Sequence, residues 1–425
     1  MRTYLLQNKD IFVSLKDFCA KNSEQFNEWS KGLKNPRMAW KKRWSTCVRE
    51  LKITAYSNEE PEWDNNSSNN NNSSSNNNTK TKITTSSCKY QQKLSEGDLQ
   101  KVKQRYNAIE ATKKTILKTG KVVEDVMLEY AMHIPYEHPL HHAILDLDDK
   151  SVVNALFDEK EVQELKTGSP SLAVPLPEDI AAFLGGISSM STFDEIWTKI
   201  EQTAASPRSN PGLFWAKDAL KSCLVRFAEG DVLEVADFSE RDYMSQIWPF
   251  VCSLSLGTVF KTHQEIESLA SAAVTNATRV ISSSEQMKSL ATGMIPDWSY
   301  WYLGKELGGV EVAAEKKNAA TKVLNEVNVK LPLLLAAQVS MLGPVQEACT
   351  VGVFLNKLDL QAMVLRSPLG GYRQLKKTKQ IPFPRHVQQV HACMVPILTV
   401  LYNCRQLMSG TAAKISQPPV NIDIY

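Results

Sequence analysis

The sequence lacks the short motifs that mark serine hydrolases of the nucleophile-elbow type and the common nucleotide-using enzymes. It has no Gly-x-Ser-x-Gly nucleophile elbow, no phosphate-binding P-loop, no Rossmann glycine fingerprint and no protein-kinase signature. Each of these motifs places particular groups against a substrate or a phosphate. Their absence therefore disfavours enzymes that use nucleotides through them.

Paired cysteines, a secretory leader and long apolar runs are missing too. The eight cysteines are scattered and include no CxxC pair, as expected of reduced thiols. The first ten residues lose their apolar character after two leucines, unlike the core of a secretory signal. The longest apolar run, residues 331–342, contains Pro332 and is too short to cross a bilayer. We expect an intracellular protein, nuclear or cytoplasmic and not secreted, with no membrane partner.

Charge of one sign is not in excess. The formal net charge is +3, with 22% of residues charged. A chain this balanced has no global attraction for nucleic acid, so a nucleic-acid partner would need a local basic surface. The sequence sets no oligomeric state.

An asparagine and serine tract divides the chain. Residues 65–78 are all Asn or Ser, a composition that cannot bury apolar surface and is typical of disorder. Such a homopolymer also points to a eukaryotic source. The divisions that we expect are an aromatic and basic helical segment at 1–63, a disordered linker at 64–92, a mostly helical region at 93–230, an α/β core at 231–410 and a tail at 411–425.

The stretch 295–317 carries a hairpin pattern. Aromatic residues dominate 299–303 and small or β-branched residues dominate 307–313, on either side of Gly304 and its neighbour. A turn centred near Gly304 places Asp297 opposite Glu311. Because side chains alternate along a strand, Glu311, Glu315 and Lys317 should share a charged face, with the apolar residues between them turned toward the core.

The order of predicted elements around this hairpin defines a fold class. A capping-box helix precedes the hairpin, and a long helix, three strands and a closing helix follow it; these elements are expected at 239–256, 318–342, 350–355, 359–365, 372–381 and 386–408. The sequence thus predicts an α/β (α+β) fold, in which a C-terminal mixed sheet is flanked by helices and the N-terminal half is mostly helical.

These elements resemble a known nuclease fold. Pro296-Asp297, followed by Gly309-Val-Glu-Val-Ala313, resembles the motif of restriction-endonuclease-like, PD-(D/E)XK domains. Residues 307–385 are also similar to an uncharacterised protein family of early-diverging fungi, with a Gly-Gly-Tyr-Arg turn at 370–373 and a Pro-Arg step at 384–385. The resemblance covers about half of the chain. It implies hydrolysis of DNA or RNA phosphodiesters, with Asp297 and Glu311 holding Mg²⁺ or Mn²⁺, ions that favour carboxylate oxygens.

The chain departs from that motif at its lysine. Ala313 stands two residues after Glu311, where the nuclease pattern has lysine; this lysine orients the attacking water and balances charge on the phosphate. The motif could be shifted, so that Glu315 is a metal ligand and Lys317 the lysine. Alternatively, Lys322 on the following helix supplies the charge. The third alternative is an inactive nuclease-like fold that serves as a binding or scaffold module for protein or nucleic acid.

Structural roles compete with each of these functional ones. Asp297 could cap the hairpin while Glu311 pairs with a cross-strand lysine on a solvated face. Bases near the last strands suit a phosphate backbone or, equally, an edge strand protected by charge. These bases are Arg366, Arg373, Lys376, Lys377, Lys379 and Arg385, of which Arg373, Lys376, Lys377 and Arg385 are the proposed nucleic-acid contacts.

A histidine cluster offers a second candidate metal site. His138, with His141 or His142 and with Asp146, has suitable ligand types. The cluster has no HExxH spacing and no cysteine partner. A proline-punctuated turn leading into the next helix explains the same residues, and we favour it.

Overall fold

We describe a computed structural model of the chain. The described residues are 93–235, 237–277, 289–315, 321–343, 347–368 and 371–416, with positions 13–14, 18, 21–22, 43–44, 47 and 56–57 near the N-terminus. The chain divides into two units, Met1–Thr85 and Ser86–Tyr425. In the first unit, β1 (Val13–Ser14) pairs in parallel with β2 (Tyr56–Ser57). Across the described residues, no helix has both the length and the apolar character needed to cross a membrane.

Helices dominate the first part of the second unit. Their bounds are α5 (Glu96–Asn107), η1 (Ala111–Lys113), α6 (Val123–Ala131), η2 (Pro139–His142), α7 (Lys150–Leu156), α8 (Glu159–Lys166), α9 (Glu178–Gly185), α10 (Phe193–Gln202), α11 (Pro211–Leu224), η3 (Val225–Phe227), α12 (Glu240–Asp242), η4 (Tyr243–Ile247), α13 (Pro249–Cys252) and η5 (Ser253–Ser255). Several begin with capping boxes, among them α12, where the Ser239 side chain accepts from the backbone N–H of Asp242. The expected capping-box helix is therefore present, although it is broken into short helical segments.

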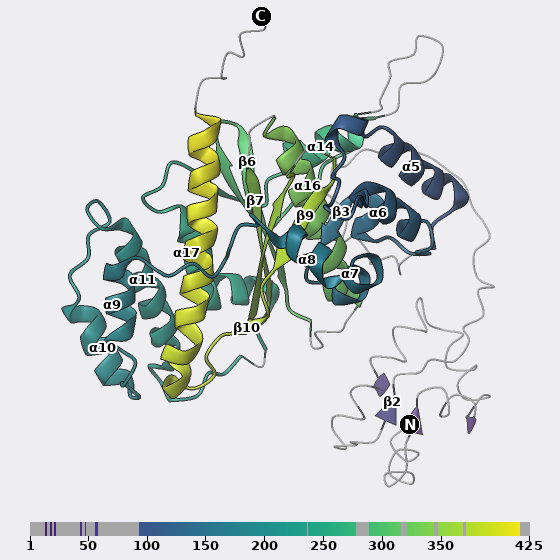
Figure 1. Ribbon diagram of the computed structural model, residues 1–425. Helices are drawn as coiled ribbons and strands as arrows, with labels where there is room; N and C mark the ends of the chain where they lie inside the picture. The colour runs from purple at the N-terminus through teal and green to yellow at the C-terminus, as the bar shows by residue number, and fades with distance from the viewer. Residues whose placement is uncertain are drawn as a thin grey trace, which may run out of the picture. The chain divides into compact units, whose positions relative to one another are not determined.

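A mixed sheet lies at the centre of this unit (Figure 1). Its strands run in the order β3-β9-β8-β7-β6-β5-β4, and β10 also pairs with β8. Their bounds are β3 (Ile144–Asp146), β4 (Lys261–Gln264), β5 (Trp298–Tyr302), β6 (Lys305–Ala313), β7 (Cys349–Asn356), β8 (Asp359–Arg366), β9 (Arg373–Lys377) and β10 (Ile381–Pro382). The remaining helices are α14 (Leu269–Asn276), α15 (Thr321–Asn325), η6 (Glu326–Lys330), α16 (Leu331–Met341), η7 (Val387–Gln389) and α17 (Val390–Ile415). The expected α/β class, with a C-terminal mixed sheet flanked by helices and a helix-rich N-terminal part, is confirmed.

Helices cover both faces of the sheet at β6. A Cβ built at Gly308 would lie 3.4 Å from the sulfur of Met408 on α17, whereas one at Gly309 would lie 2.9 Å from the side chain of Leu334 on α16. Consecutive side chains of a strand point to opposite faces, so α17 covers one face and α16 the other. Figure 1 shows α17 lying along the sheet, with α9, α10 and α11 grouped on its side of the molecule. The expectation that β6 has a solvated, charged face is therefore wrong.

The hairpin of β5 and β6 has the expected register for a reason that the sequence did not reveal. The turn consists of Leu303 and Gly304, both with positive φ (46° and 74°). A two-residue hairpin loop needs positive φ at both positions to match the twist of the two strands. This turn alone would place Asp297 one position away from Glu311. A bulge between Tyr300 and Trp301 shifts the register, so that Trp298 pairs with Val310. Asp297 therefore lies opposite Glu311.

The long helix after β6 contains a π-helical turn. α15, η6 and α16 follow one another without a break, and η6 has π geometry. Pro332 stands near the start of α16 and has no N–H, so the helical hydrogen bond from its position is missing and its ring crowds the preceding turn. A widened turn before the proline relieves this crowding, and the helix continues through it as a π turn.

Candidate metal centre

Asp297 is held at the start of β5 by the backbone of β6. Its N–H donates to Val310 O at 3.1 Å, and its Oδ2 accepts from Val312 N at 2.6 Å. Its own carbonyl accepts from Glu265 N at 3.1 Å. Burial raises the pKa of the Asp297 carboxyl above its usual value, although the bond from Val312 works in the opposite direction. Among the described residues, none donates a hydrogen bond to Oδ1 of Asp297.

Glu311 is a buried carboxylate with one open oxygen. The residue is 3% exposed, because β6 is covered on both faces. Its Oε2 accepts from Lys330 Nζ at 2.5 Å, whereas no described group hydrogen-bonds to its buried Oε1. Burial raises the pKa of Glu311 to about 7, since Lys330 offsets only part of the desolvation. An unpaired buried carboxylate oxygen costs free energy unless a proton or a cation satisfies it.

Lys330 brings a positive charge to Glu311 from the helix. The side chain lies at the end of η6 and is 33% exposed, compared with 4% for the side chain of Glu311. Burial works to lower the pKa of Lys330, but Glu311, Glu326 and Asp297 outweigh it, and the pKa rises. The amine therefore remains protonated beside the two carboxylates at neutral pH.

More acidic residues surround this group. Glu326, one helical turn before Lys330, raises the pKa of Glu311, and Glu240 and Glu265 raise that of Asp297. The described residues contain no group of three or more His, Cys, Asp or Glu side chains arranged to hold a metal ion. The site thus offers two facing carboxylates, which is the number that protein often supplies to Mg²⁺, with water and substrate phosphate completing the shell.

The lysine at this site is Lys330, whereas the sequence pointed to Lys317 or Lys322. Lys317 lies outside the described residues, and Lys322 lies in α15 with a side chain outside the described part. Glu315 is half-buried beyond the end of β6, which stops at Ala313, so it is not on the strand as expected. The signal that could have identified Lys330 is its separation of four residues from Glu326, which places the two charged residues on one side of the helix.

The predicted nucleic-acid contacts do not form one surface. Arg373 donates to His142 O and to Ser340 Oγ, and Lys377 pairs with Asp146 at 2.8 Å with its side chain 8% exposed. Lys376 and Lys377 are consecutive on β9 and therefore point to opposite faces.

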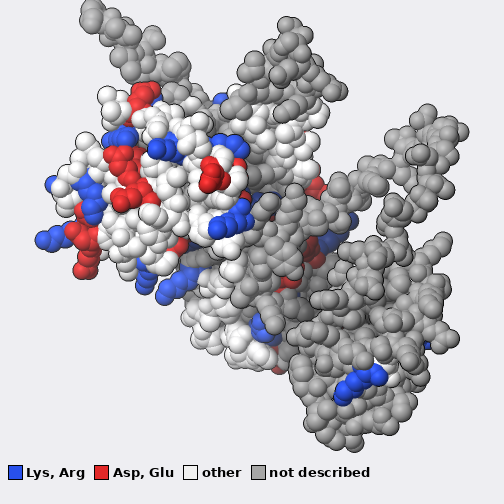
Figure 2. Space-filling model, turned by 90° about the vertical axis from the view of Figure 1, so that its right-hand side faces the viewer, with Lys and Arg blue, Asp and Glu red and all other residues white. Residues whose placement is uncertain are grey.

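The basic residue Arg385 lies apart from β9 and is exposed. On the face drawn in Figure 2, basic and acidic side chains are interspersed over the described surface. That face offers mixed charge rather than a continuous basic strip.

The histidine side chains make local hydrogen bonds in and beside η2. His138 Nδ1 accepts from Leu140 N at 3.2 Å, and His141 Nδ1 accepts from His138 N at 3.0 Å. His142 Nε2 lies 3.3 Å from Glu137 Oε1. The structure does not bring these rings and Asp146 together as a ligand set, and the proline-containing turn explains them.

Comparison with known proteins adds no identification: no protein-family model, curated protein or solved structure matches this chain.

Proposed function

We propose that the chain is a divalent-metal-dependent phosphodiesterase acting on DNA or RNA, with Asp297 and Glu311 as its metal ligands. The observation that carries the proposal is the meeting of these carboxylates with Lys330, whose Nζ lies 2.5 Å from Glu311. The lysine missing from position 313 thus has an equivalent on the adjoining helix. The resemblance to PD-(D/E)XK domains implies the same three group types.

The donor set fits a small divalent cation. The open oxygens, Oδ1 of Asp297 and Oε1 of Glu311, are hard ligands that suit Mg²⁺ or Mn²⁺. Such an ion, when bound, lowers the pKa of a water and neutralises phosphoryl oxygens. No third carboxylate is needed, because substrate phosphate and water complete the coordination of these ions.

The chain's own residues have separate tasks. The bond from Val312 N fixes Asp297, so its free oxygen is held in position without a substrate. Lys330 supplies positive charge where negative charge develops on a phosphate, and its partly exposed ammonium can reach solvent. Glu311 has a pKa of about 7, so its carboxyl must lose its proton before Oε1 can hold the ion.

A nuclease assay tests the proposal. Purified protein is incubated with labelled single-stranded DNA, duplex DNA and RNA, in EDTA and then in Mg²⁺ or Mn²⁺. We expect metal-dependent cleavage that falls by roughly two orders of magnitude or more in Glu311→Gln, Asp297→Asn and Lys330→Met. Lys305→Met is the matched control, because Lys305 is on the same hairpin and donates to Met341 O away from the site. Activity that survives both carboxylate changes contradicts the assignment.

A binding role without catalysis is the second candidate. It is favoured by the Lys330–Glu311 bond and by the pKa of Glu311, which leaves much of this carboxyl protonated at neutral pH when no metal is present. Under this alternative, the nuclease-like fold binds nucleic acid or protein without turnover, and a chelator leaves binding unchanged. Arg373, Lys376, Lys377 and Arg385 remain the proposed nucleic-acid contacts only as separate points of contact, because they do not form one surface and Arg373 and Lys377 also bond within the protein. We place the protein inside the cell, in the nucleus or cytoplasm.

A further inference from the structure

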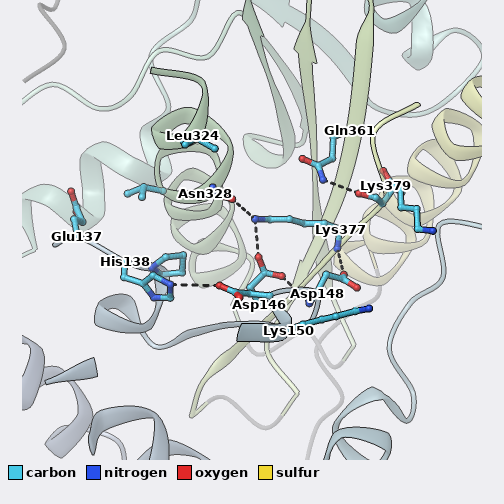
Figure 3. A pocket seen from close by; sticks show the side chains of 14 residues that line it. Glu137, His138, Asp146, Asp148, Lys150, Leu324, Asn328, Gln361, Lys377 and Lys379 are labelled. Atoms are coloured by element: carbon cyan, nitrogen blue, oxygen red, sulfur yellow. Dashed lines mark hydrogen bonds and ion pairs between the residues drawn. The ribbon is translucent and has the colours of Figure 1, made fainter. Parts of the chain in front are cut away.

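A pocket lies on the other side of η6 from Glu311. η6 reaches β6 through Lys330 and β9 through Asn328, whose Oδ1 accepts from Lys377 Nζ at 2.9 Å. The pocket adjoins the β9 side, between this helix and the segment 137–150, and has a volume of about 720 Å³ (Figure 3). Gln361 in its wall is level with Glu311 across β7, so the two sites are roughly 10 Å apart at the strand spacing of a sheet.

The carboxylates of this pocket already have partners in the protein. Asp146 pairs with Lys377 and accepts from Asp148 N at 3.1 Å. Asp148 accepts from the backbone N–H of Lys377 at 2.7 Å. Asp149 caps α7, and Glu137 bonds to a histidine ring. The acidic side of the pocket therefore has little demand for a cationic ligand, and no group of these residues is arranged to hold a metal.

Three other donors of the pocket, on Lys150, Lys379 and His138, form no such hydrogen-bonded pairs with described carboxylates. Lys150 and Lys379 are exposed pocket-lining residues, and neither forms an ion pair with a described carboxylate. His138 Nδ1 accepts from Leu140 N, which puts the proton of the neutral ring on Nε2. Burial lowers the pKa of His138, so the ring is neutral at pH 7. Its Nε2 lies 3.9 Å from Asp149, beyond hydrogen-bond distance.

Charge and shape vary from one end of the pocket to the other. Figure 3 shows Lys150 and Lys379 extending at one end, while His138 and Leu324 lie toward the other. Pro139 and Val329 add apolar surface to the lining. The volume is in the range of sites that enclose small organic ligands.

We propose that this pocket binds a small organic phosphate of nucleotide size. The phosphate lies between the ammonium groups of Lys150 and Lys379, and the ring system lies against Pro139, Leu324 and Val329. His138 Nε2–H donates to a polar atom of the ligand. This site is separate from the Asp297 and Glu311 pair and does not depend on phosphodiesterase activity.

Calorimetric titration of the full chain in EDTA tests the proposal, with adenosine 5′-monophosphate as the probe. We expect saturable binding of this nucleotide, with adenosine and inorganic phosphate each binding at least tenfold more weakly. Lys150→Ala/Lys379→Ala should weaken nucleotide binding by roughly a hundredfold, about tenfold for each charge-assisted contact. Leu324→Ala should weaken binding of the nucleotide while leaving that of phosphate unchanged.

The controls separate this site from other sources of binding. Lys103→Ala/Lys166→Ala removes two exposed lysines from outside the pocket lining and should bind the nucleotide as the unmodified chain does. Glu311→Gln should also retain binding, so failure of the pocket is distinct from failure of the metal site. Unchanged affinity in the Lys150 and Lys379 double variant would overturn the proposal. Phosphate that binds as tightly as the nucleotide would overturn it too, because the apolar wall would then contribute nothing.

Discussion

Replacing Glu311 with glutamine probes the electrostatics of the candidate metal centre. Glutamine keeps the shape of the side chain and can still accept from Lys330, but it cannot ionise. Glu311 is almost fully buried on a central strand, so its ionisation changes the free energy of unfolding of the whole fold. The substitution should therefore change how stability depends on pH, rather than lower stability at every pH.

The magnitude follows from the shift in pKa. Burial raises the pKa of Glu311 from 4.5 to about 7, and a shift of this size corresponds to about 3 kcal/mol of unfolding free energy. The folded state binds this proton more tightly than the unfolded state does. The corresponding stability is therefore present below the unfolded pKa of 4.5 and is lost as the pH rises through about 7. The Glu311→Gln variant has no carboxyl to ionise, so it should not lose this unfolding free energy as the pH rises.

Urea denaturation in EDTA at several values from pH 4.5 to 8 measures the effect. The unfolding free energy of Glu311→Gln, relative to the unmodified chain, should rise by about 3 kcal/mol across this range. Val310→Ala, at the neighbouring buried position of β6, is the control. It should cost roughly 2 kcal/mol through lost packing, equally at each pH. A difference between Glu311→Gln and the unmodified chain that stays constant over this range would refute the reasoning.

Two further predictions concern packing and a buried ion pair, both measured by urea denaturation. A Cβ at Gly308 would lie 2.3 Å from a backbone carbonyl oxygen of β7, whereas one at Gly309 would lie 2.9 Å from the end of a leucine side chain, which can move. Gly308→Ala should thus cost roughly 3 kcal/mol and Gly309→Ala about 1 kcal/mol, and equal losses would contradict this explanation. Lys377→Met leaves the nearly buried carboxylate of Asp146 without its partner and should cost about 3 kcal/mol. Adding Asp146→Leu to the Lys377→Met variant should recover part of that loss. If the loss in the double variant equals the sum of the losses in the two single variants, the two residues do not stabilise the fold as a pair.

The sequence predicted the centre of the sheet better than its edges. The strands β6, β7 and β8 have eight or nine residues each, with apolar residues inside them, and they appear close to their expected positions. The edge strands β3 and β4 were not predicted. β3 has three residues within a segment interpreted as a turn, and β4 is the polar sequence Lys-Thr-His-Gln. Their strand conformation comes from pairing with β9 and β5, which are distant in sequence, and no local pattern records it.

The sequence predicted that Asp297 lies opposite Glu311, but it did not predict that both faces of β6 are buried. Alternation along β6 could not distinguish a solvated face from one covered by a helix, because both faces of a central strand can be buried. The adjacent Gly308 and Gly309 were the available signal, since small residues allow helices to approach a strand closely from both sides. With both faces covered, Glu311 becomes a buried acid that needs a partner.

Burial of β6 also explains why the positive charge comes from the helix. Ala313, at the position where the nuclease motif has lysine, is fully buried on the face that carries Glu311. A lysine there would have to place its charge beneath the covering helix, at a high desolvation cost. Lys330 reaches the same carboxylate from η6 and keeps a third of its side chain exposed. Lys330 thus provides the charge at a lower desolvation cost than a lysine at position 313 would. The absence of lysine from the strand therefore does not by itself imply the loss of the site.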